Sequence, residues 1–274
     1  ELPLLAILEL CGIPAEDRKD FFEWTNAMMF SHDPEMSADK DVAEAASMQM
    51  IVYAMGLAEK HKTEPNDDII GALLRGNGTE QGLSEDEFVW FFLMVIAAGN
   101  ESTRTVTSHG MRLLMENPEQ LQYLVDNPDK IPNACEEMLR YNTAFTLMRR
   151  QCVEDTEVAG HLIKKGDKVI MHYHTVNHDE TIFGEDAMQF DERRAERMPD
   201  LYNQHRAFGI GQHFCLGTHL ARLEMRVMFE EIIPSLRNPK LVGEVAYTRS
   251  NLVNGIKRMD ITFDPEVKPS EQAA

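Results

Sequence analysis

The sequence predicts a mainly α protein of the α+β class, with one long central helix and small β-sheets. Three features of the chain support this prediction. Apolar residues recur at helical spacing through the first half, the pattern from residue 85 to 115 is unbroken, and strand-like segments begin only after Arg150. We expect a single domain over residues 1–264 and a disordered tail over 265–274.

Four helices are expected before the long one, at residues 2–10, 15–29, 39–61 and 67–74. The long helix begins after Ser84, which together with Glu87 fits a capping box. It continues to residue 115, because the pair Asn117 and Pro118 then interrupts the pattern. At a rise of about 1.5 Å per residue such a helix is about 48 Å long.

The first half of the long helix is apolar around its whole circumference. We therefore expect it to be buried on every side. Within this apolar stretch lies segment 98–103, which contains a glycine, an acid and two hydroxyl groups. Such residues destabilise a buried helix, so they call for a functional explanation.

The second half of the chain is more varied. Helices are expected at 118–125, 131–141 and 217–236, and strands at 157–163, at 168–174 and within 244–263. The strands around residues 157–174 are expected to meet at the turn 165–167. Residues 179–207 are polar and irregular, which is typical of a long functional loop.

Composition excludes several classes of function. The formal net charge of −19 disfavours nucleic acid and anionic lipid as partners. The longest apolar run, 88–98, is too short for membrane insertion, and no leader sequence is evident, so a cytoplasmic protein is expected. The four cysteines show no paired spacing, so we expect reduced thiols.

The segment from Phe208 to Gly217 contains the most informative cysteine. Its glycines allow a tight turn and a close approach to a flat ligand, and Cys215 directly precedes a helix. Free N–H groups at a helix start favour thiolate and lower a thiol pKa. A thiolate on such a loop is a typical axial ligand of haem iron. A zinc site with His213 and a buried structural cysteine are the alternatives.

Three segments together resemble the signatures of the cytochrome P450 family. They are the loop 208–217, the pair Glu137 and Arg140, and the segment 98–102. The resemblance covers the chain from the end of the family's E helix to its C-terminus. With the stretch 249–255, it is greatest to soluble bacterial members that oxidise sterols and lipids.

This resemblance implies a role for each matching residue. Cys215 would be the metal ligand, and His213 and Arg150 would contact the haem propionates, although Arg150 as a solvated surface residue is the alternative. Further cofactor-binding positions implied by the resemblance are Phe208, Gly209, Gly217 and Ala98.

Three further groups follow from the resemblance. Glu137 and Arg140 would form a structural network with Arg194, whereas an isolated pair of this spacing would be a weak surface ion pair. Glu101 and Ser102 would be catalytic by delivering protons, with Thr103 able to share that task. The substrate pocket would be lined by aliphatic residues that could equally be ordinary core, namely Met94, Ala97, Ala98, Leu147, Leu252 and Val253.

The resemblance implies a haem-thiolate monooxygenase with haem b as its cofactor. Its substrate would be an apolar small molecule such as a sterol side chain or another lipid. Electrons from NAD(P)H would arrive through a ferredoxin-type partner, because the chain has no nucleotide-binding fingerprint. Arg222 and Arg226 form a basic patch that suits this partner, unless they pair with Glu224 or Glu230.

The alternative is a non-catalytic haem-binding fragment of a longer P450. The chain begins with Glu1, and the N-terminal part of the family fold, with its haem-covering helix, is not found in the sequence. On this reading the fold is truncated at the N-terminus. The 274 residues alone would then bind haem weakly and expose an open pocket.

Overall fold

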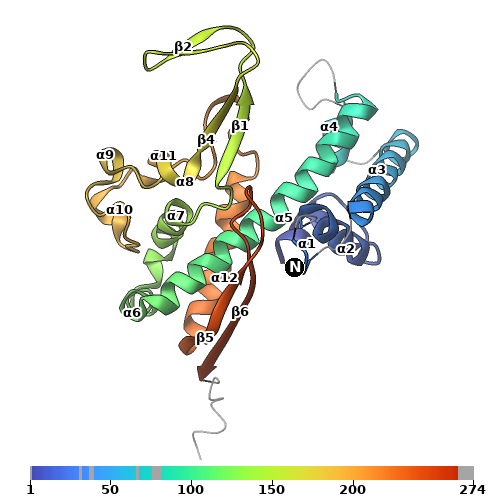
Figure 1. Ribbon diagram of the computed structural model, residues 1–274. Helices are drawn as coiled ribbons and strands as arrows, with labels where there is room; N and C mark the ends of the chain where they lie inside the picture. The colour runs from blue at the N-terminus through green and yellow to red at the C-terminus, as the bar shows by residue number, and fades with distance from the viewer. Residues whose placement is uncertain (1, 31–32, 37–39, 66–67, 76–81, 265–274) are drawn as a thin grey trace, which may run out of the picture. The chain divides into compact units, whose positions relative to one another are not determined.

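The computed structural model describes residues 2–30, 33–36, 40–65, 68–75 and 82–264. The chain divides into two compact units, residues 1–104 and 105–274, and the division falls within the long helix α5 (Figure 1). Each unit is described by itself. The single domain stays a prediction, and the expected tail at 265–274 lies outside the described residues.

Unit 1 is helical. Its elements are α1 Leu2–Leu10, α2 Arg18–Met29, α3 Lys40–Thr63, α4 Ile69–Arg75 and the first part of α5 Glu85–Glu116. The five helices expected from the sequence are confirmed, with ends that differ by at most three residues. The capping box is confirmed as well, because the Ser84 N–H donates to Glu87 Oε2 at 2.9 Å and the Glu87 N–H to Ser84 Oγ at 3.3 Å.

Aromatic rings and one glycine contact hold unit 1 together. The ring of Phe21 packs against those of Tyr53 and Phe92, with centroids 4.9 and 6.0 Å apart. A Cβ atom at Gly99 would lie 1.9 Å from Cδ1 of Ile7. The absence of a side chain at Gly99 therefore allows α1 to pack directly on α5.

The expectation that the first half of α5 is buried on every side is wrong. Trp90 and Met94 are 64% and 53% exposed, and Ala98 is exposed as well. These residues are four apart and so share one face of the helix. Phe92 and Ile96 on other faces are buried, because helices α1 and α2 pack there. An apolar stripe is left uncovered.

Unit 2 combines the second part of α5 with helices and small sheets. Its long helices are α6 Pro118–Asp126, α7 Ile131–Tyr141 and α12 Thr218–Ser235. Short helices are η1 Pro128–Lys130, α8 Tyr173–Val176, α9 Glu180–Phe183, α10 Arg194–Arg197, α11 Leu201–Gln204 and η2 Gly211–His213. Within the described ranges no helix is long and apolar enough to cross a membrane.

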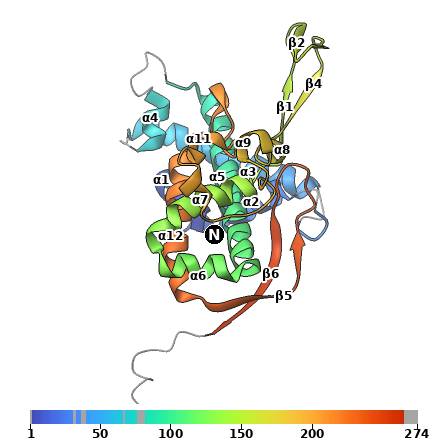
Figure 2. The same ribbon diagram turned by 90° about the vertical axis from the view of Figure 1, so that its left-hand side faces the viewer.

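Three two-stranded antiparallel sheets complete unit 2. They pair β1 Leu147–Gln151 with β4 Lys168–His172, β2 Thr156–Val158 with β3 His161–Ile163, and β5 Arg237–Tyr247 with β6 Ile256–Asp264. In both views β1, β4 and the β2–β3 hairpin project from the helices of their unit (Figures 1 and 2). The mainly α fold with small sheets is confirmed.

Two sequence expectations in unit 2 need correction. Residues 157–163 are not one strand but a hairpin that turns at Ala159 and Gly160, whose φ angles are 50° and 81°. These residues adopt the left-handed region and reverse the chain at once. Strand β4 therefore pairs with β1 and not with residues 157–163. The polar loop 179–207 is also more ordered than expected, because it contains the short helices α9, α10 and α11.

The core of unit 2 lies where α5, α6, α7 and α12 pack together. Its fully buried members include Leu114, Leu124, Ala134, Met138, Phe229 and Ile233. Gly110 of α5 lies at the closest approach, because a Cβ there would be 2.6 Å from Met138 Sδ and 2.7 Å from Phe229 Cζ. Both neighbours are buried and cannot move away without opening the core.

Adding one methyl group at Gly110 should therefore destabilise the protein. We expect Gly110→Ala to lower the free energy of unfolding by about 1–3 kcal/mol through overpacking, measured by urea denaturation. Gly56→Ala is the matched control, since Gly56 lies within α3 and nothing lies within 4 Å of its added Cβ. The control should be stabilised by about 0.5–1 kcal/mol. Equal effects of the two changes would contradict the packing assignment.

Candidate functional site

The loop 208–217 connects the segment after α11 with the start of α12. Gly209 and Gly211 have φ angles of 74° and 77°, a region that favours glycine. The Cys215 N–H donates to the Phe208 carbonyl oxygen at 2.9 Å and closes the loop. Gly217 then caps α12, so Cys215 lies two residues before the cap.

The Cys215 thiol is partly buried at this helix start. Burial raises its pKa above the ordinary value, while a hydrogen bond from the Gly217 backbone and the charge of Arg222 act in the opposite direction. The lowered thiol pKa expected from the sequence is not found, because desolvation is the largest influence on this group. The N–H group that would stabilise a thiolate is nevertheless in place.

The loop also carries exposed apolar side chains near Cys215 in the sequence. Ile210 is 66% exposed, Leu216 75%, and Phe214 is also exposed. His213 lies at the end of η2 and is exposed as well. Isolated apolar residues on a surface are common, but three on one short loop beside a sulfur indicate a surface for an apolar ligand.

A second set of polar contacts holds the loop from behind. Arg222 of α12 forms two hydrogen bonds with Glu136 of α7, at 2.7 and 2.9 Å. The Arg222 guanidinium also stacks over the rings of Tyr202 and Phe208, 3.7 and 4.5 Å from their centroids. His205 Nε2 lies 2.9 Å from Glu136 Oε2. Together these contacts fix Phe208, the first residue of the loop, to α7 and α12.

These contacts change the interpretation of the basic patch. Arg222 pairs with Glu136, not with Glu224 or Glu230, and its side chain is only 13% exposed. Arg226 pairs with Glu230 at 3.7 Å and is exposed. The sequence did not predict the pair of Arg222 and Glu136, because the two residues are 86 positions apart. Its one signal in the sequence was a second acid beside Glu137.

Glu137 is the centre of a buried ion network. Its side chain and those of Arg140 and Arg194 are all 0% exposed. Arg140 donates to both carboxylate oxygens at 2.7 Å, and Arg194 Nε donates to Oε1 at 3.0 Å. The Asp191 N–H adds a further donor at 3.1 Å. The alternative of a surface ion pair is wrong for this cluster.

The two arginines of this network also bind the following loop. Their remaining N–H groups donate to backbone carbonyl oxygens of Asn177, Phe183, Asp186, Ala187 and Gln189 at 2.7–3.0 Å. These donors satisfy carbonyl groups of a segment that has little regular secondary structure of its own. The network thereby fixes the path of residues 177–194.

The polar segment of α5 belongs to unit 1. The Ser102 hydroxyl donates to the Ala98 carbonyl oxygen at 2.8 Å, one helical turn earlier. Glu101 is 1% exposed and pairs with Arg104 at 2.6 Å. Thr103 is also buried. Cys215 lies in unit 2.

The expected pocket residues fall into two sets. In unit 2, the Thr146 N–H beside Leu147 donates to the Leu252 carbonyl oxygen at 3.0 Å, and Val253 forms a β-bridge with Phe145. The structure thus brings these two segments together. In unit 1, Met94 and Ala98 lie on the exposed stripe of α5, and Ala97 is partly buried.

Arg150 lies on strand β1, opposite Val169 of β4. Its side chain is exposed and donates to the Arg149 carbonyl oxygen at 3.1 Å. The described contacts do not connect it with His213. A role of either residue toward a bound carboxylate stays a prediction.

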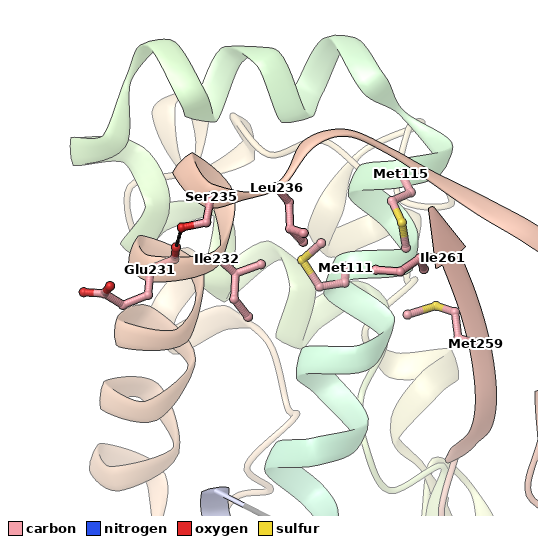
Figure 3. A pocket seen from close by; sticks show the side chains of 8 residues that line it. All are labelled: Met111, Met115, Glu231, Ile232, Ser235, Leu236, Met259 and Ile261. Carbon is pink, nitrogen blue, oxygen red and sulfur yellow. Dashed lines mark hydrogen bonds between the residues drawn. The ribbon is translucent and has the colours of Figure 1, made fainter. Parts of the chain in front are cut away.

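A separate groove of about 500 Å³ lies between α5, α12 and β6 of unit 2. Met111, Met115 and Met259 line it, and Figure 3 shows the Glu231 carboxylate pointing away from it. Ser235 donates to the Glu231 carbonyl oxygen at 2.8 Å. The groove therefore lacks the convergent polar groups of a reactive site.

Comparison with known proteins decides the family. A model of the cytochrome P450 family matches residues 129–238. Steroid C26-monooxygenase from Mycolicibacterium smegmatis is 37% identical over 276 aligned residues, which cover 100% of this chain and 62% of that protein. The solved structure of CYP109E1 from Bacillus megaterium with testosterone has a TM-score of 0.84 at 30% identity, covering 96% of this chain and 70% of that one. The chain belongs to the cytochrome P450 family.

A second P450 has a name that describes a different lipid. The methyl-branched lipid omega-hydroxylase of Mycobacterium bovis is 35% identical, over 96% of this chain and 60% of its own length. The chain thus spans about 60% of the length of these curated relatives. The resemblance to P450 enzymes that oxidise sterols and lipids is confirmed.

The residues around Cys215 fit the haem that the P450 family uses. Among the described residues, no three His, Cys, Asp or Glu side chains cluster as ligands of a metal ion, so a zinc site at His213 and Cys215 has no further protein ligands. A single sulfur suits a metal that brings its other ligands with it, as haem iron does. The exposed apolar side chains of the loop suit a flat apolar ring.

Low pH should reduce the free energy of unfolding, because His178 beside the Glu137 network becomes protonated more readily in the unfolded chain. Burial, with the charges of His174, Arg140 and Arg194, lowers the pKa of His178 from 6.5 to about 4. The unfolded chain therefore binds this proton at a higher pH than the folded chain. The stabilisation is complete above pH 6.5 and is lost as the pH falls toward 4.

We expect His178→Gln to reduce this pH dependence. Between pH 7 and 4.5 the wild type should lose about 2–3 kcal/mol more unfolding free energy than the variant, at about 1.4 kcal/mol per pH unit. Urea denaturation at several pH values measures it. His161→Gln, on the exposed strand β3, is the control and should follow the wild type. Parallel curves for wild type and His178→Gln would contradict the assignment.

Proposed function

We propose that this P450 is a haem-thiolate monooxygenase that hydroxylates an apolar substrate, a sterol side chain or a methyl-branched lipid. The observation that carries the proposal is the single thiol of Cys215, held by a closed loop at the start of α12 with the Gly217 N–H directed to its sulfur. When bound, haem b supplies the oxidation chemistry, inserting one atom of dioxygen into a C–H bond and reducing the other to water.

In this proposal the residues of unit 2 hold the cofactor. Cys215 would hold the haem iron through its sulfur, and the hydrogen bond from Gly217 would tune the electron donation of that sulfur. Phe208, Gly209 and the backbone of the loop would contact the haem. His213 and Arg150 are both exposed and offer donors to carboxylate groups.

Residues of α5 manage protons in the proposed reaction. The Ser102 hydroxyl is already oriented by its bond to the Ala98 carbonyl oxygen, which loosens the helix locally. Glu101 is buried and negatively charged beside Arg104, so it can relay a proton only when this ion pair opens. Thr103 supplies a second hydroxyl next to Ser102.

Apolar residues exclude water and select the substrate. In unit 2, Leu147 and the turn with Leu252 and Val253 offer one apolar surface. In unit 1, the exposed stripe of α5 with Met94 and Ala98 offers another. The names of the steroid and lipid relatives point to a long apolar molecule that is hydroxylated near one end. We further propose that the protein is cytoplasmic and receives electrons from NAD(P)H through a ferredoxin-type partner.

The ligand role of Cys215 has a spectroscopic test. The reduced, carbon-monoxide-bound protein should show the strongly red-shifted Soret band of thiolate-ligated haem. Cys215→His should abolish this band, because imidazole donates less electron density than thiolate. Cys152→Ser is the control and should retain it. A red-shifted band in Cys215→His would overturn the proposal.

The proton role of Ser102 has a test in product coupling. We expect Ser102→Ala to bind haem and substrate but to divert electrons to peroxide, because a lost proton-transfer group slows its step by about 10²–10⁴-fold. The loss should be larger in Ser102→Ala/Thr103→Ala. The measurement is product formed per NAD(P)H consumed. Unchanged coupling in both variants would refute the role.

A further inference from the structure

The turn between β5 and β6, residues 248–255, carries Leu252 and Val253 of the proposed pocket. On one side it is bound to the chain just before β1. The Thr146 N–H donates to the Leu252 carbonyl oxygen at 3.0 Å, and the Asn254 N–H donates to the Ala144 carbonyl oxygen at 2.9 Å. The Thr146 hydroxyl adds a hydrogen bond to the Asn251 carbonyl oxygen at 2.8 Å.

The turn also contains its own cap. Ser250 Oγ accepts the N–H groups of Leu252 and Val253, both at 3.1 Å. The Thr248 N–H donates to the Gly255 carbonyl oxygen at 2.9 Å and closes the base of the turn. These bonds fix the shape of the turn but not its distance from helix α5.

His109 of α5 connects the turn to this helix. Its Nε2 lies 2.7 Å from the Asn254 carbonyl oxygen, and the residue is 2% exposed. Because a carbonyl oxygen only accepts, Nε2 must carry the proton. The imidazole also stacks on Tyr247 at the end of β5, with centroids 6.0 Å apart and planes at 24°. One ring therefore contacts both the strand and the turn.

The chemistry of this contact requires a neutral donor. Burial lowers the pKa of His109 to about 4, so the ring is uncharged at neutral pH. Its Nδ1 is buried and has no hydrogen-bond partner among the described residues. A buried nitrogen without a hydrogen-bond partner lowers the free energy of unfolding. The fold bears this cost at Nδ1 while Nε2 donates to Asn254.

We propose that His109 is a positioning residue that sets the substrate preference of the apolar pocket by fixing the turn of Leu252 and Val253 to α5. This inference rests on the proposed function, because it assigns the turn to the substrate pocket. A leucine at this position would fill similar space without donating, so the turn would move away from α5. The pocket would then discriminate less between apolar ligands of different length.

The test compares His109→Leu with His109→Gln, which keeps an N–H donor of similar reach. Val106→Ala is the matched control, because it removes buried carbon from α5 but leaves the His109 bond intact. The first measurement is amide hydrogen exchange of residues 248–255. We expect about tenfold faster exchange in His109→Leu, the effect of one lost buried hydrogen bond, and near wild-type exchange in His109→Gln.

The second measurement is the ratio of dissociation constants for cholesterol and testosterone, from the ligand-induced shift of the haem spectrum. The ratio should change at least about threefold in His109→Leu and return toward wild type in His109→Gln, while Val106→Ala keeps the wild-type ratio. Should His109→Leu not fold, His109→Asn replaces it, since its shorter amide cannot reach the Asn254 carbonyl.

The outcomes separate this inference from the proposed function. Unchanged amide exchange of residues 248–255 in His109→Leu overturns the role of His109. Faster exchange with an unchanged ratio of the two dissociation constants overturns it as well. Failure of the glutamine variant to restore the ratio also overturns it. A wild type without the thiolate band overturns the proposed function, and the exchange measurement then still decides whether His109 holds the turn.

Discussion

The burial of the Glu137 carboxylate is the constraint on which most of unit 2 depends. A carboxylate with no exposure is costly unless its charge and its lone pairs are compensated. Arg140 and Arg194 compensate the charge, but they bring further N–H groups into the interior. Those groups are satisfied by carbonyl oxygens of residues 177–189 and by the Asp186 carboxylate. The charge of one side chain therefore determines the path of a long segment.

Helix α7 transmits this order to the cysteine loop. Glu137 contacts residues 177–194, while the adjacent Glu136 contacts Arg222 of α12 and His205. Arg222 in turn stacks on Phe208, where the loop begins. Two consecutive acids thus connect the packing of α7 to the position of Cys215. The position of the Cys215 sulfur depends on such support, because loop 208–217 has little regular structure of its own.

Local patterns predicted the helices well, and contacts distant in sequence were predicted poorly. Helical spacing and the Ser84 capping box located α1 to α7, because these signals lie within a few residues. The Arg222–Glu136 pair joins residues 86 apart, and a charge pattern alone assigned Arg222 to the surface. The motifs identified Cys215 and Glu137, but the raised pKa of Cys215 results from tertiary burial, which no motif contains. The contact of His109 with the β5–β6 turn had no sequence signal.

Hydrogen exchange of residues 177–194 and 205–217 in Glu137→Gln tests the central claim most directly. A neutral amide cannot compensate two buried guanidinium groups, and breaking such a cluster costs about 3–5 kcal/mol. The account predicts lost protection in both segments while β5 and β6 keep theirs. Glu196→Gln, from the exposed Arg193–Glu196 pair, should leave both segments protected. Equal protection of the two segments in Glu137→Gln and wild type would contradict the account.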